Sequence, residues 1–80
     1  MKEHYQERYE KMGLLISVYR RSRGMTQLML GNALDVDAQH ISRIERAVNG
    51  ISLDMLFAIA DELQVKPHQL LDFDKIDGIR

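Results

Sequence analysis

The stretch 25–46, MTQLMLGNALDVDAQHISRIER, constrains the fold more than any other part of this chain. Its pattern predicts two short helices that meet at a tight turn, formed by residues 35–36. Thr26 is a suitable N-cap for the first helix, which we expect to end near residue 34. Asp37 is a suitable N-cap for the second, which we expect to continue to about residue 46. In the second helix an apolar side lies opposite a polar, cationic side.

The remaining sequence also has helical spacing, without strand-like alternation of any length. A first helix is expected from about Tyr5 to Arg23, closed by Gly24 in a left-handed cap. Ser52 is expected to cap a fourth helix that ends near Leu63. The apolar face of that helix comprises Leu53, Leu56, Ala60 and Leu63.

Pro67 fits the first turn of a short fifth helix, with Leu70 and Leu71 turned inward. The fold class is therefore predicted as all-α, a five-helix domain with an N-terminally extended first helix. We divide the chain into an N-terminal extension at 1–12, expected to be helical, a helix-turn-helix domain at 13–72, and a short acidic tail at 73–80.

A chain of 80 residues forms one domain. It has no cysteine, which excludes disulfides and cysteine metal sites, and its three histidines, His4, His40 and His68, are too separated to suggest zinc. No metal or cofactor is expected. The apolar runs are far shorter than the roughly 20 residues that cross a bilayer. The charged N-terminus is unlike a signal peptide, so we expect a cytoplasmic protein.

Charge is distributed unevenly along the chain, although the net charge is only −1. Residues 20–53 contain five arginines against three carboxylates, a net of +2, and residues 54–80 contain three cations against six carboxylates, a net of −3. Such a dipolar molecule can present one face to DNA. Its affinity for DNA of arbitrary sequence should be modest, because few phosphates can be neutralised.

No catalytic constellation is found in the sequence. The serines Ser17, Ser22, Ser42 and Ser52 have no credible His–Asp partners, and neither a G-x-x-x-x-G-K nor a G-x-G-x-x-G motif occurs. The carboxylates are spread over an acidic surface rather than paired in a cleft. We therefore expect neither an enzyme nor a small-molecule ligand.

The polar face of the helix near residues 38–46 has the chemistry of a DNA-reading surface. It comprises Ala38, Gln39, Ser42, Arg43 and Arg46, opposite Ile41 and Ile44. Glutamine can bond an adenine edge, arginine a guanine edge, and the alanine methyl can contact thymine. Residues of these types are also ordinary on a solvated helix face, so the face alone leaves both interpretations open.

Five groups of residues have the spacing of a known family. They are Gly13, Ile16, Tyr19 and Arg20; the run 23–27; Leu30 with the run 34–36; the run 41–46; and Leu53, Leu56, Ile59, Ala60, Leu63 and Val65. With this spacing, the chain from Gly13 to Leu71 strongly resembles the phage repressor and Cro-like helix-turn-helix family, also called the XRE family. The resemblance covers about three-quarters of the chain. It implies a five-helix domain that binds operator DNA as a dimer.

The resemblance also implies roles for single residues. Base contacts are expected from Ala38, Gln39, Ser42 and Arg43, and phosphate contacts from Arg23, Thr26, Gln27, His40, Arg46 and Asn49. Gln27 should also brace Gln39. The alternative role for Arg23 is to cap the first helix. The alternative for His40 is a solvated side chain without a role in binding. Arg20 and Glu45 are expected to form a largely buried structural ion pair.

Three positions depart from the family pattern. Gly31 replaces the usual small alanine between the two short helices, at a cost in helix propensity. Asp35 stands where a glycine normally adopts a left-handed conformation, which aspartate tolerates better than most residues. Ala47 replaces the glycine that often ends the second short helix, so we expect that helix to run slightly longer.

The function that these observations favour is a sequence-specific regulator of transcription that binds double-stranded DNA. It is expected to be a repressor that binds a palindromic operator as a homodimer, without a membrane or small-molecule partner. The expected dimer surface comprises Leu70, Phe73, Ile76 and Ile79, with the N-terminal Tyr5, Tyr9 and Met12 as a second candidate. The alternative is a protein-interaction module or an antitoxin on the same fold, which the acidic C-terminal third favours.

Overall fold

The computed structural model describes residues 3–79, without the side chains of Glu3 and Ile79. Its elements are η1 (Glu3–Tyr5), α1 (Gln6–Ser22), α2 (Gln27–Ala33), α3 (Ala38–Glu45), α4 (Leu53–Leu63), η2 (Pro67–Leu71) and α5 (Phe73–Ile79), where η denotes a 3-10 helix. The described part is all-α with five α-helices, which confirms the predicted fold class. No helix within residues 3–79 is long and apolar enough to span a membrane.

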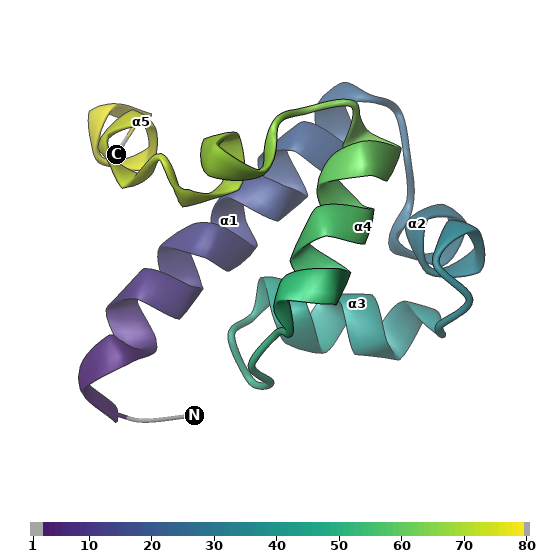
Figure 1. The fold of residues 1–80 in the computed structure, drawn as a ribbon, viewed down its shortest axis with the longest axis horizontal. Coiled ribbons are helices and arrows are strands. Elements are labelled where there is room, and N and C mark those ends of the chain that lie inside the picture. The colour runs from purple at the N-terminus through teal and green to yellow at the C-terminus, as the bar shows by residue number, and fades with distance from the viewer. Residues whose placement is uncertain (1–2, 80) are drawn as a thin grey trace.

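The helices surround one apolar core. In Figure 1 the long α1 runs diagonally behind α4, α2 and α3 lie together on one side, and α5 packs on the other side. The core is formed by apolar residues from each of the five helices and from η2, among them the fully buried Leu15, Ile16, Leu30, Ile41, Ile44, Ile59, Leu63, Leu70 and Ile76. Helix α3 thus contributes two isoleucines, Ile41 and Ile44, to this core.

The beginnings of α2, α3 and α4 are fixed by side-chain caps. The hydroxyl of Thr26 accepts a hydrogen bond from the Met29 N–H at 3.0 Å, and that of Ser52 accepts one from the Met55 N–H at 3.1 Å. The Asp37 carboxylate accepts one from the His40 N–H at 2.7 Å. These caps satisfy backbone donors that a helix leaves free at its start, and they confirm the predicted positions.

Helices α1 to α4 all end in the same backbone motif. The residue in the left-handed region is Gly24, Asp35, Ala47 or Gln64, with φ of 70°, 59°, 59° and 58°. In each motif the N–H of the next residue donates to the carbonyl five positions earlier. The four hydrogen bonds are Met25 to Arg20 at 3.1 Å, Val36 to Gly31 at 2.9 Å, Val48 to Arg43 at 2.9 Å, and Val65 to Ala60 at 3.0 Å. This is the Schellman motif, which usually takes glycine in the left-handed position. Of these four helix ends, only that of α1 has a glycine in the left-handed position.

Two of the family departures have a structural consequence. The expectation that Ala47 lengthens α3 is wrong: α3 ends at Glu45, because Ala47 takes the left-handed conformation with its methyl group buried. Gly31 is required by close contact, since a methyl group there would lie 2.7 Å from the Val36 carbonyl oxygen. The lost helix propensity is therefore the cost of bringing α2 against the turn.

The C-terminal segment differs from the expected tail. Residues after the η2 segment form α5, in which Ile76 is fully buried, Phe73 packs against the core, and the Lys75 ammonium donates to the Tyr19 hydroxyl at 2.9 Å. Lys11 forms an ion pair with Asp77 at 3.1 Å, and hydrogen bonding to Asp77 raises the pKa of Lys11. The segment is thus part of the domain.

This placement corrects the expected dimer surface. Leu70 and Ile76 are fully buried within their own chain, so they are not available to a second copy, and Phe73 is half-buried in the same cluster. The side chain of Ile79 lies outside the described residues. In contrast, two leucines expected to face inward are exposed: Leu53 at 67% and Leu71 at 47%.

We predict that Gln64→Gly raises the free energy of unfolding by about 0.5–1 kcal/mol, because it removes the steric cost of a side chain in the left-handed region. Gln64 is exposed, so little packing is lost. Denaturant unfolding measures the change. Gln64→Ala, which keeps the Cβ atom, should bring no gain, and an equal gain from both variants would contradict the explanation.

Candidate nucleic-acid interface

Helix α3 has two distinct faces. Ile41 and Ile44, each 1% exposed, point into the core, whereas Gln39 and Arg43 are exposed and Ser42 is half-buried. Ala38, the first residue of the helix, is half-buried as well. The residues predicted to contact bases therefore lie on the outward side of α3. The opposite side of the helix is buried in the core. An α-helix with such a face fits the major groove of B-form DNA.

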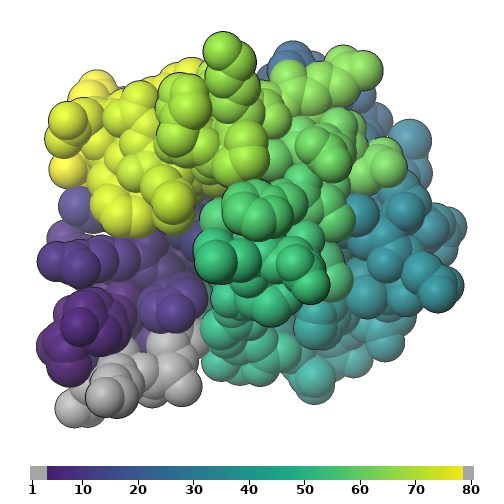
Figure 2. Space-filling model, in the orientation of Figure 1, coloured from purple at the N-terminus to yellow at the C-terminus, as the bar shows by residue number. Residues whose placement is uncertain are grey.

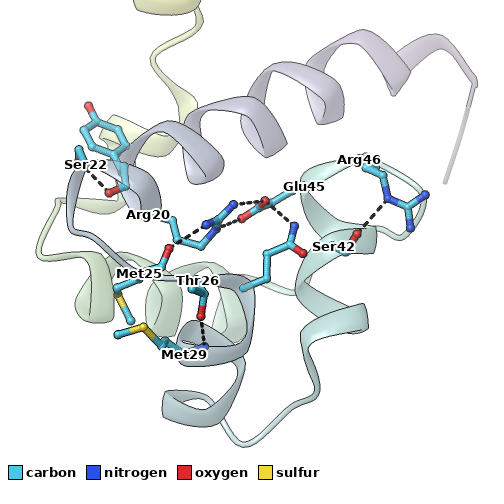
Figure 3. A network of polar contacts seen from close by, with 10 residues as sticks. Arg20, Ser22, Met25, Thr26, Met29, Ser42, Glu45 and Arg46 are labelled. Atoms are coloured by element: carbon cyan, nitrogen blue, oxygen red, sulfur yellow. Dashed lines mark hydrogen bonds and ion pairs between the residues drawn. The ribbon is translucent and has the colours of Figure 1, made fainter.

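Arg46 lies next to this face, just after the end of α3. Its Nε donates to the Ser42 hydroxyl at 3.1 Å, which holds the guanidinium along the outer side of the helix (Figure 3). Asn49 is half-buried in the loop that follows, and its N–H donates to the Arg43 carbonyl at 3.4 Å. Both predicted phosphate residues thus lie at the C-terminal end of α3.

The first turn of α2 supplies a second group of predicted phosphate residues. Thr26 is exposed and caps the helix, so its hydroxyl is already used by the backbone. Gln27 does not brace Gln39 as the family resemblance implied; its side-chain amide donates to Glu45 Oε1 at 3.0 Å. The correction has a simple cause, since the Glu45 carboxylate is a charged acceptor and such hydrogen bonds are stronger than those between neutral groups.

Arg20 and Glu45 form the ion pair that the resemblance implied. Arg20 Nε and Nη2 donate to the two carboxylate oxygens at 2.7 and 3.0 Å, and Nη1 donates to the Met25 carbonyl at 2.8 Å. The side chains of Arg20 and Glu45 are 7% and 6% exposed. Hydrogen bonding to Glu45 raises the pKa of Arg20, against the opposing effect of burial. Figure 3 shows both side chains pointing toward each other between α1 and α3.

Arg23, a further predicted phosphate residue, has other side-chain contacts in the structure. Arg23 Nε donates to the Leu63 carbonyl at 2.8 Å and its Nη2 to the Gln64 carbonyl at 3.4 Å. The side chain therefore satisfies carbonyls at the end of α4. The backbone of Arg23 caps α1, as the alternative for this residue expected, with its N–H donating to the Tyr19 carbonyl at 3.1 Å. His40 is half-buried on α3, and its backbone N–H donates to the Asp37 cap.

One contact at this surface had no signal in the sequence. The Gln6 side-chain amide donates to the Ala47 carbonyl at 3.1 Å, so the first turn of α1 holds the loop that follows α3. The two residues are 41 positions apart, and no local pattern connects them.

A family model covers most of the chain. A family model described as helix-turn-helix, HTH_3, matches residues 16–70 of the chain. The match spans the second part of α1, the whole of α2, α3 and α4, and most of η2. A search of curated proteins finds no significant match.

Solved structures give three informative neighbours. The P22 c2 repressor, solved in complex with synthetic operator 9T, is 32% identical over 79% of this chain and 96% of its own, with a TM-score of 0.72. The restriction-modification controller protein C.AhdI from Aeromonas hydrophila is 22% identical over 85% of this chain and 99% of its own, with a TM-score of 0.79. The hypothetical transcription factor NHTF from Neisseria is 23% identical over 90% of this chain and 85% of its own, with a TM-score of 0.80. The last two show a shared fold.

We predict that Glu45→Gln lowers the free energy of unfolding by about 3–5 kcal/mol, because it leaves the buried Arg20 charge without a counter-ion. Urea unfolding at low temperature measures the loss. Glu62→Gln makes the same change in net charge at an exposed position of α4 and should have little effect. Equal unfolding midpoints for wild type and Glu45→Gln would contradict the structural role of the pair.

Proposed function

This chain belongs to the helix-turn-helix family HTH_3, the XRE family that its sequence resembles, and we propose that it is a repressor that reads double-stranded operator DNA with the outer face of α3. The family is one of DNA-binding regulators of transcription rather than enzymes. The observation that carries the proposal is the exposure of Gln39 and Arg43 on a helix whose opposite side, Ile41 and Ile44, is fully buried.

The proposed mechanism separates base reading from backbone binding. Gln39 and Arg43 reach adenine and guanine edges in the major groove, while Ser42 and Ala38 contact the edges beside them. Arg46, Asn49 and the amide end of α2 bind the flanking phosphates, which fix the position of the helix without reading sequence. The likeness to the P22 c2 repressor, which was solved in complex with a synthetic operator, supports operator DNA as the ligand.

We further propose a palindromic operator bound by a homodimer. One copy offers only a few base contacts, and a two-fold pair doubles them when half-sites lie about 34 Å apart on the same side of the duplex. An operator occupied in this way excludes polymerase sterically, which is the proposed mode of repression. Selection of bound sequences from a random DNA pool would give the operator needed for the tests below.

We predict that Arg43→Ala weakens binding to the selected operator by about 1–3 kcal/mol and relaxes base preference at one position in each half-site. Fluorescence anisotropy with the operator and single-base variants measures both effects. Lys66→Ala removes an equal charge from an exposed position between α4 and η2 and should leave affinity and preference unchanged. A uniform loss across all sequences would reassign Arg43 to a phosphate.

We predict a different signature for Arg46→Ala: weaker binding of all sequences alike, with the slope of log affinity against log salt reduced by about 1 for each copy. A titration series over ionic strength measures this slope. Binding without salt dependence, in the wild type or in this variant, would favour the alternative of a protein-interaction module.

A further inference from the structure

One side of α1 contacts the C-terminal end of α3 at three positions. Gln6, Gly13 and Arg20 follow one another at intervals of seven residues, close to two helical turns, so they lie on the same side of α1. Arg20 pairs with the Glu45 carboxylate, and a methyl group at Gly13 would lie 2.8 Å from the Glu45 carbonyl carbon. Gln6 donates to the carbonyl of Ala47, just beyond the helix. Figure 2 shows the purple start of α1 and the teal-green segment after α3 on the same face of the molecule.

The contact of Gln6 completes the fixation of one peptide group, that between residues 47 and 48. The Ala47 carbonyl accepts a hydrogen bond from the Gln6 amide at 3.1 Å, and the Val48 N–H donates to the Arg43 carbonyl at 2.9 Å. Because a peptide group is planar, hydrogen bonds at its two ends fix its orientation. Ala47 has the left-handed conformation with which the chain leaves α3. The orientation of this peptide therefore determines the direction of the loop that follows.

The proposed phosphate residue Asn49 depends on this peptide. Its N–H makes only a long hydrogen bond of 3.4 Å, to the Arg43 carbonyl that the Val48 N–H already uses. Among the side chains described within residues 4–78, that of Gln6 is the only one that forms a hydrogen bond with residues 47–50. Arg46 differs, because its guanidinium is held by the Ser42 hydroxyl at 3.1 Å.

We propose that Gln6 is a positioning residue for DNA binding, which acts through Asn49 by fixing the peptide between residues 47 and 48. The proposal rests on the proposed function, in which Asn49 binds a phosphate. It extends the DNA-binding unit to a residue outside the predicted helix-turn-helix domain at 13–72 and outside the family match at 16–70. Without the Gln6 donor, the partly buried Ala47 carbonyl loses its partner, and the peptide is free to turn toward water.

Amide hydrogen exchange without DNA tests the first step. Gln6→Met removes the donor and keeps a similar length and helix propensity, and it should accelerate exchange of the Val48 N–H at least about threefold. The Val65 N–H is the internal reference, because it forms the equivalent hydrogen bond at the end of α4 and a general loss of stability would accelerate both amides. Gln64→Met, at an exposed glutamine at the end of α4, should leave the Val48 rate unchanged.

Binding to the selected operator tests the second step. Gln6→Met should weaken binding by about threefold to tenfold, the loss expected for one neutral hydrogen bond. Single-base variants of the operator should lose affinity equally, because phosphate contacts carry no direct sequence information. Gln64→Met should bind as wild type does. A merely structural role of Gln6 would lower the unfolding midpoint and leave the affinity of the folded protein unchanged.

A double-mutant cycle identifies the route by which Gln6 acts. Combined with Asn49→Ala, the loss from Gln6→Met should be less than additive, because both changes remove the same phosphate contact. Combined with Arg46→Ala, the two losses should add, since Ser42 supports Arg46 independently.

Three results would overturn the proposal: Val48 exchange that changes only in parallel with Val65, an operator affinity of Gln6→Met equal to that of wild type, or full additivity with Asn49→Ala. Any of these alongside Arg43-dependent operator binding would refute the role of Gln6 alone. A wild type that shows no Arg43-dependent binding of DNA would instead refute the proposed function, and the role of Gln6 with it.

Discussion

The paired side chains of Arg20 and Glu45 determine where α3 stands. Glu45 is the last residue of α3, Arg20 is near the end of α1, and the arginine also binds the Met25 carbonyl just before α2. Gln27 of α2 donates to the same carboxylate. Three helices thus converge on one buried charge pair. Such pairs add little net stability, because desolvation offsets their attraction. The consequence here is positional, since a different pose of α3 would leave a buried charge without its partner.

Close backbone contacts at two glycines, Gly13 and Gly31, also fix the position of α3. A methyl group at position 13 would lie 2.8 Å from the Glu45 carbonyl carbon, and Gly31 is equally close to the turn before α3. The glycines let α1 and α2 approach both ends of α3. The left-handed residues Asp35 and Ala47 then turn the chain away at once. Short connections at both ends leave α3 little freedom to rotate, which keeps Gln39 and Arg43 outward.

Sequence patterns were sufficient where the determinant is local. The caps at Thr26 and Asp37 and the buried positions Ile41 and Ile44 follow from helical periodicity and backbone chemistry within one or two turns. The Arg20–Glu45 pair came from family resemblance instead, because 25 residues separate the partners. The roles of individual base-reading residues remain predictions.

Other features depend on contacts that local patterns do not contain. Helix α5 was taken for an acidic tail because it has only three apolar or aromatic residues, yet Ile76 fits the core beside α1 and Lys75 donates to the Tyr19 hydroxyl. Arg23 was assigned to a phosphate or to the cap of α1; its backbone does cap α1, but its side chain donates to the Leu63 carbonyl at the end of α4. In both cases the partner lies more than 35 residues away in sequence.

The distribution of charge also changes once contacts are known. Residues 20–53 contain five arginines, but Arg20 is neutralised by Glu45 and Arg23 is bound to the end of α4. Arg43 and Arg46 stand at the outer face of α3. With so few phosphates neutralised by one copy, affinity for DNA of arbitrary sequence must be low. On the proposed function, tight binding then requires correct base contacts and their duplication by a second copy. A regulator that works in this proposed way gains selectivity from weak single domains, so the position that the buried Arg20–Glu45 pair gives to α3 matters as much as the residues on its outer face.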